Sequence, residues 1–173
     1  MQRAFAWLDR ATLAHPLKVK CSSGAFLALV GDVSAQRVEG TPLTEVDLLR
    51  SCKLVLWRTA IHTPFIHVWF NVMERHVPGA SIAAVMKKVF LDQALVSPLL
   101  HSFFLPMMAV FDGCGPEEER LRCKFVPLLK MNYCLWPAVH LTTFSIIPLR
   151  HRVMWVNCWA CVWMGILSSL NSR

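Results

Sequence analysis

One long uncharged segment of the chain limits the folds that are open to it. From Gln93 to Phe111 no Asp, Glu, Lys or Arg occurs, and the apolar run around it covers residues 89–111. A helix needs about 20 mostly apolar residues to cross the hydrocarbon core of a bilayer. The run also contains Asp92, Pro98 and Pro106, which a core strand of a soluble protein would not combine. We therefore expect a membrane helix with one face turned toward other helices or water.

The composition favours a single integral membrane domain over residues 1–173. Hydrophobic residues make up 55% of the chain and charged residues only 17%, whereas a soluble domain is roughly a quarter charged. The net charge is +7, but the basic residues are scattered between apolar runs and form no nucleic-acid-binding motif. We expect no direct binding of nucleic acid. The basic residues instead are placed to flank membrane spans and meet lipid headgroups.

The hydropathy pattern predicts an all-α fold, a polytopic membrane helical bundle with four transmembrane helices and interfacial amphipathic helices. Residues 1–20 are predicted to form a basic helix at the membrane surface that Pro16 ends or kinks. A second surface helix is predicted within residues 112–130, with an apolar stripe that Pro127 interrupts. The predicted spans are residues 17–36, 48–73, 89–111 and 131–149. Residues 153–172 are uncharged and form either a fifth, C-terminal span or a helix along the interface, where Trp is favoured.

One face of the first predicted span carries small residues. Gly24, Ala28, Gly31 and Ala35 recur every three or four residues, which is the spacing that lets membrane helices approach closely. This face is therefore predicted to pack against another helix.

Polar residues inside the predicted spans are the candidate functional groups. Such groups are costly at membrane depth, so they pair, point inward or line a wet path. Two readings are open: a pore lining, or pairing across helices that fixes the bundle, for example Asp32 or Asp92 with Arg58. The candidates for a pore lining or an intramembrane polar network are Asp32, Gln36, Arg58, His67, Asp92, Gln93 and Asn132.

No metal site, cofactor or enzymatic activity is expected. His62 and His67 are five residues apart and do not share a helical face. The chain has none of the common hydrolase, zinc-protease or phosphate-loop motifs. The seven cysteines cannot all pair within one chain. Cys114 and Cys123 flank the acidic helix and are the redox candidates, while Cys158 and Cys161 are interpreted as packing residues.

The order and spacing of many residues resemble a known family over about residues 13–168. This is the family of Mpv-seventeen and the twenty-two-kilodalton peroxisomal membrane protein. The matching positions are His15, Pro16, Gly31, Asp32, Ala35, Gln36, Asp47, Arg50, Pro64, His67, Trp69, Arg75, Pro78, Gly79, Lys88, Asp92, Gln93, Pro98, Asn132, Trp136, Pro137, Phe144, Pro148, Arg152, Trp163, Leu167 and Ser168. The chain departs from the family pattern at Thr63, where Gly is usual, at Phe70, where Tyr is usual, and at His140, where Gln is usual.

The resemblance implies a protein of the mitochondrial inner membrane, with the peroxisomal membrane as the alternative. It also implies four spans, no enzymatic activity, and a role in mitochondrial homeostasis and mitochondrial DNA maintenance through a poorly selective channel. The partners expected on this reading are the lipid bilayer and small solutes of unknown identity, with a homo-oligomer left open. The alternative function is a non-conducting scaffold that organises membrane complexes, with its apolar helix faces as docking surfaces.

Overall fold

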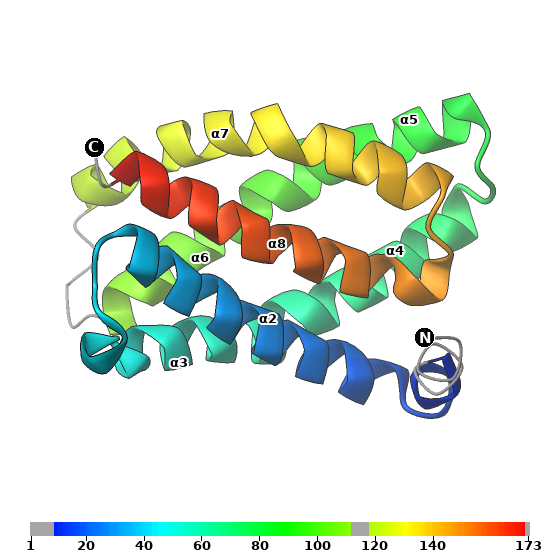
Figure 1. Ribbon diagram of the computed structural model, residues 1–173. Coiled ribbons are helices and arrows are strands. Elements are labelled where there is room, and N and C mark those ends of the chain that lie inside the picture. Colours follow the sequence, from blue (N-terminus) through cyan, green and yellow to red (C-terminus); the bar gives the residue numbers. More distant parts are fainter. Residues whose placement is uncertain (1–8, 112–117, 172–173) are drawn as a thin grey trace. The chain divides into compact units, whose positions relative to one another are not determined.

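Every regular element that the structure describes is a helix, so the predicted all-α class is confirmed (Figure 1). The structure is a computed structural model that describes the backbone of residues 9–111 and 118–171, with side chains for residues 9–111 and 125–166. The chain divides into two compact units, Met1–Asn71 with Pro148–Arg173, and Val72–Ile147. A single integral membrane domain over residues 1–173 stays a prediction.

The first unit is built around helix α2 (Pro16–Val38). Residues 9–14 are also helical, and Pro16 begins α2 because a first-turn proline has no backbone N–H to satisfy. A short 3₁₀ helix, η1 (Leu43–Glu45), leads into α3 (Leu48–Leu56). The chain then continues through η2 (Trp57–His62) into α4 (Thr63–His76), and it returns to this unit with α8 (Leu149–Asn171).

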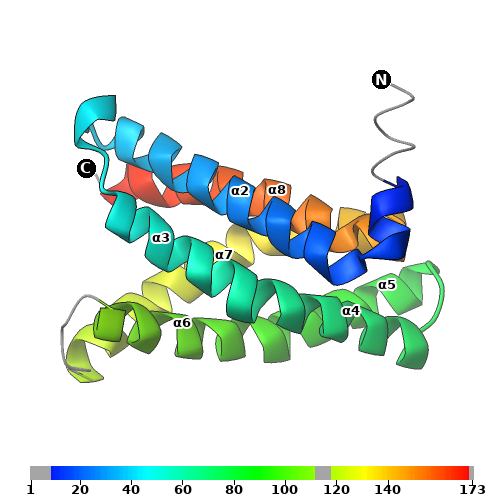
Figure 2. The same cartoon turned by 90° about the horizontal axis from the view of Figure 1, so that it is seen from below.

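The small-residue face of α2 packs closely, as predicted, against α8 and the α3–α4 segment (Figures 1 and 2). Gly24, Ala28, Gly31 and Ala35 are all buried. A Cβ atom at position 31 would lie 3.2 Å from Cα of Cys161 in α8. A Cβ atom at position 24 would lie 2.9 Å from Oγ1 of Thr63, so this close approach depends on glycine.

The second unit pairs α7 (Glu118–Ser145) with a long interrupted helix. That helix consists of α5 (Ile82–Leu91), η3 (Asp92–Val96) and α6 (Ser97–Phe111), and α7 packs against all three segments. Within the described residues, Ile82–Phe111 is the one helix whose length and hydropathy suit a membrane crossing. The third predicted span is therefore supported by composition and length, while the count of four spans stays a prediction.

An ion pair between a buried lysine and a partly exposed glutamate closes the turn between α4 and α5. The side chain of Lys88 is fully buried, and its Nζ lies 2.8 Å from Oε2 of Glu74. Lys88 also donates to the carbonyl oxygen of Gly79 at 2.9 Å, and Gly79 has a φ of +86° that favours glycine. Lys88 thus ties α5 both to the end of α4, through Glu74, and to the turn itself, through Gly79.

Two predicted boundaries are wrong. The predicted surface helix and the start of the predicted fourth span are parts of one helix, because α7 runs through Pro127 without a break from Glu118 to Ser145. A proline removes only one helical hydrogen bond, and neighbouring contacts in a bundle can sustain the helix through it. The fourth span was predicted to reach residue 149, but Leu149 is the first residue of α8.

Candidate functional site

Two wide helical turns carry several of the predicted polar residues. Both η2 and η3 are π-helical, and each is followed by a proline, Pro64 or Pro98. The backbone N–H of Thr63 donates to the carbonyl of Arg58, and the N–H of Ser97 donates to the carbonyl of Asp92. Each bond spans five residues rather than four, and turns of this type occur often at functional sites.

Each wide turn leaves one carbonyl oxygen that the following proline cannot serve, because proline has no N–H. These carbonyls belong to Gln93 and Thr59, five residues before the two prolines. The hydroxyl of Tyr133 donates to the Gln93 carbonyl at 3.2 Å, and the Cys21 thiol donates to the Thr59 carbonyl at 3.5 Å. A side chain from a neighbouring helix therefore completes each turn within its own unit.

A buried polar cluster in the second unit is centred on Asp92. The carboxylate oxygen Oδ2 of Asp92 lies 3.1 Å from Nε2 of His140 and accepts from Nε2 of Gln93 at 3.2 Å. The Asn132 amide donates to Oε1 of Gln93 at 3.2 Å and to the hydroxyl of Ser97 at 3.1 Å. Three predicted candidates, Asp92, Gln93 and Asn132, thus lie in one network on η3 and α7.

The His140 ring is held between aromatic residues of α7. Its centroid lies 5.5 Å from that of Phe144, nearly parallel at 16°, and 5.7 Å from that of Trp136. This packing fixes the imidazole beside the Asp92 carboxylate. At position 140, where Gln is usual in the family, this chain thus has a histidine whose ring nitrogen contacts Asp92.

Asp32 and Gln36 form a second cluster, which joins α2 to the start of α3. Oδ2 of Asp32 accepts from Nε2 of Gln36 at 2.8 Å and from the hydroxyl of Ser51 at 2.6 Å, while Oδ1 lies 3.0 Å from Nε of Arg50. Gln36 also exchanges two hydrogen bonds with the backbone of Asp47, at 2.7 and 3.1 Å. These bonds fasten the α2–α3 connection, which favours a structural role for the pair.

Of the two candidate partners of Arg58, Asp32 does not form the ion pair. Asp32 pairs with Arg50, which also forms a two-point contact with Glu39 at 2.8 and 3.1 Å. Arg58 instead contacts the ring of His62, one helical turn away, at 3.0 Å. Sequence spacing places Arg58 and His62 together, but it does not indicate which of two arginines reaches the acid.

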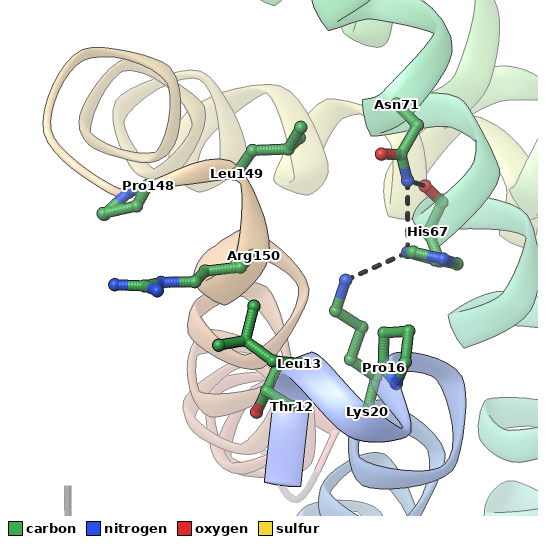
Figure 3. A pocket seen from close by; sticks show the side chains of 9 residues that line it. All are labelled: Thr12, Leu13, Pro16, Lys20, His67, Asn71, Pro148, Leu149 and Arg150. Carbon is green, nitrogen blue, oxygen red and sulfur yellow. Dashed lines mark hydrogen bonds between the residues drawn. The ribbon is translucent and has the colours of Figure 1, made fainter. Parts of the chain in front are cut away.

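His67 lies beside a lysine that sequence reasoning assigned to the membrane surface. Nζ of Lys20 is 3.0 Å from Nδ1 of His67, and Lys20 is only 3% exposed. The amide of Asn71 donates to the His67 carbonyl at 2.6 Å. A cavity of about 530 Å³ opens here, and Figure 3 shows the Lys20 amine directed toward His67, with Leu13 and Leu149 across the space.

The remaining candidates cannot be placed. Residue 114 and the side chain of residue 123, the two redox candidates, lie outside the described residues. Among the side chains that are described, no group of three or more His, Cys, Asp or Glu is placed to hold a metal ion.

Sequence reasoning missed Lys20, Ser97 and Tyr133. For Ser97 a signal exists in the chain: a hydroxyl residue followed by proline occurs five residues after Arg58 and again five residues after Asp92. The partners of Lys20 and Tyr133 lie on other helices, 47 and 40 residues away in the sequence, so no local spacing indicates these contacts.

Comparison with known proteins adds a family context. The sequence profile of the Mpv17 / PMP22 family matches residues 118–168. The chain is 33% identical over 171 residues to Protein sym-1 of Neurospora crassa, covering 97% of this chain and 99% of that one. It is 33% identical over 163 residues to mitochondrial inner membrane protein Mpv17 of Homo sapiens, covering 92% and 93%. The chain is 34% identical over 170 residues to Protein sym1 of Aspergillus oryzae, covering 97% of this chain and 98% of that one. No solved structure matches the chain.

Proposed function

This chain belongs to the Mpv17 / PMP22 family and is a protein of the mitochondrial inner membrane, and on that premise we propose that it is a poorly selective channel for small solutes. The channel is a bundle of four spans without enzymatic activity. It supports mitochondrial homeostasis and, through it, maintenance of mitochondrial DNA.

The observation that carries this proposal is the polar cluster around Asp92. Asp92 is 2% exposed, yet it lies in Ile82–Phe111, the helix best suited to cross a membrane. A carboxylate at membrane depth is costly, and acids in such positions often mark ion or solute pathways. A conducting path beside Asp92 would favour cations, because a negative charge lowers their energy along the path.

The direct test is conductance of the purified full-length protein in a planar bilayer. We expect currents with a preference for cations, and we expect Asp92→Asn to reduce that preference because it removes the charge and preserves the shape. The matched control is Glu45→Gln, the same chemical change at an exposed carboxylate in η1, which should leave selectivity unchanged. Currents identical in Asp92→Asn and the wild type would remove Asp92 from the path.

The link to mitochondrial DNA is tested in cells. Loss of the protein should lower mitochondrial DNA copy number, and re-expression of the wild type should restore it. Restoration by a variant that has lost conductance but still folds would separate DNA maintenance from the channel.

A non-conducting scaffold is the second candidate. Its support is that the polar groups within each cluster pair with one another, while large apolar side chains such as Phe26, Phe90 and Phe103 are exposed and available for docking. Silent bilayers with well-folded protein across voltage and redox conditions, together with stable crosslinked partners, would favour this function.

A further inference from the structure

The cavity of the first unit contains a buried cation that has no acidic partner. Lys20 lies in the first turns of α2 and is 3% exposed. Within the part of the chain that the structure describes, no carboxylate pairs with its ammonium group, and His67 Nδ1 is its polar contact at 3.0 Å. Removing a charge from water without a counter-ion is strongly unfavourable, so this site favours an anion.

Asp9, which contacts the cavity residue Arg150, is already engaged elsewhere. Oδ1 of Asp9 lies 2.8 Å from Nε2 of His151 and 3.6 Å from Nε of Arg150. Arg150 also lines the cavity, although its guanidinium is directed away from Lys20 in Figure 3. Asp9 is therefore balanced by a neighbouring cation, and the positive charge of Lys20 is left for another partner.

The geometry of Lys20 leaves donors for such a partner. An ammonium group has three N–H donors, and one of them points to His67. Because Lys20 donates to Nδ1, this ring nitrogen acts as an acceptor toward it. Lys20 lines the cavity of about 530 Å³, and an oxyanion in it would accept charge-assisted hydrogen bonds from the other N–H donors.

The cavity wall has a second, apolar character. Leu13, Pro16, Pro148 and Leu149 line it together with Lys20 and His67. A site with one buried ammonium and apolar walls matches an amphiphile better than a fully hydrated ion. Basic pockets between membrane helices bind phospholipid headgroups by this combination of charge and apolar contact.

We propose that this cavity binds a phosphate group, carried by an anionic phospholipid, with the phosphate oxygens on the Lys20 ammonium and the adjoining part of the lipid against Leu13 and Leu149. The same phosphate chemistry is offered by free inorganic phosphate, and the experiment distinguishes these two sources. The site lies in the first unit and does not depend on conduction beside Asp92.

The test measures binding to the purified full-length protein in detergent with three probes: phosphatidylglycerol, phosphatidylcholine and inorganic phosphate. Phosphatidylglycerol should raise the thermal unfolding temperature, and phosphatidylcholine should have a much smaller effect because its phosphate is neutralised within the headgroup. Lys20→Gln should weaken phosphatidylglycerol binding about tenfold or more, the loss typical of one charge-assisted contact. Lys18→Gln, an exposed lysine two residues away on the same helix, is the matched control and should bind like the wild type.

Two further variants decide the case if Lys20→Gln does not fold. Lys20→Arg should retain binding because the charge stays, and Leu149→Trp should lose it because the larger ring fills the cavity and leaves Lys20 in place. Competition by inorganic phosphate would identify the free ion as a ligand, whereas binding of phosphatidylglycerol alone would identify the lipid. Equal binding of phosphatidylglycerol by wild type and folded Lys20→Gln, or unchanged binding by Leu149→Trp, would overturn the proposal.

Discussion

The hydroxyl of Tyr133 donates a hydrogen bond to the backbone carbonyl of Gln93 at 3.2 Å, across two helices of the second unit. The carbonyl needs this donor because the N–H of Ser97 bonds to Asp92 and Pro98 has no N–H to offer. The first unit repeats the arrangement with Cys21, Thr59 and Pro64. In each of the two wide turns, a side chain from another helix thus donates to the carbonyl that the proline leaves unpaired.

Replacing Tyr133 with Phe should destabilise the protein by about 0.5–1.5 kcal/mol, the usual net contribution of one hydrogen bond. The free energy of unfolding in detergent is the measurement. In a Pro98→Ala background the same change should cost less, because the alanine that replaces the proline supplies an N–H that can reach the Gln93 carbonyl. An equal cost in both backgrounds would show that the hydroxyl does not compensate for the proline.

His140 provides a test of what the Asp92 carboxylate requires. His140→Leu removes a contact of 3.1 Å and should cost about 1–3 kcal/mol, because a buried charged acceptor loses a donor while Gln93 still serves it. His140→Gln, the residue usual in the family, keeps a donor and should retain most of the stability. Thermal unfolding of both variants checks this, and equal losses would assign the effect to ring packing against Phe144.

Gly24 and Thr63 should behave as a coupled pair. Gly24→Ala places a methyl group 2.9 Å from Oγ1 of Thr63 and should cost about 1–3 kcal/mol through overpacking. Thr63→Ala removes that oxygen, so Gly24→Ala should cost clearly less in the Thr63→Ala background. Unfolding free energies of the four proteins form the double-mutant cycle. A coupling energy near zero would mean that the side chains of Asn157 and Arg58, also close to this position, set the limit.

Lys88 should be important for the turn between α4 and α5. Lys88→Met removes the hydrogen bonds to Glu74 and Gly79 and should destabilise by about 1.5–3 kcal/mol, the range for bonds to a charged group. The partly exposed Glu74 is rehydrated in this variant, which limits the loss. Lys87→Met changes an exposed neighbour and should have little effect on the unfolding temperature. Similar losses in both variants would contradict this role of Lys88.

Hydropathy and spacing were enough to predict helices at each span and the close packing of α2. The small residues Gly24 and Gly31 define that face by their positions alone, because helical periodicity places them together. The contact between Arg58 and His62 is local in the same sense, since residues four apart are neighbours on a helix.

The partners of the charged residues could not be predicted in the same way. Asp32 reaches Arg50 rather than Arg58, and Lys20 is buried against His67 rather than exposed on the helix. Both outcomes depend on which helices become neighbours, and hydropathy does not contain that information. The polar character of these groups was visible in the sequence, but their contacts were not.

The wide turns have a consequence for insertions and deletions. A π-type turn holds one surplus residue in an α-helix, and its wider winding offsets the rotation of about 100° that this residue would otherwise add. Deleting Ala94 would let Ile82–Phe111 wind as a regular α-helix while α5 and α6 keep their present faces. Asn132 and Tyr133 would then lose the wide turn at Gln93 that they contact. A one-residue gap at this point in the alignment of a relative would therefore record the loss of a wide turn inside a helix rather than a shortened loop.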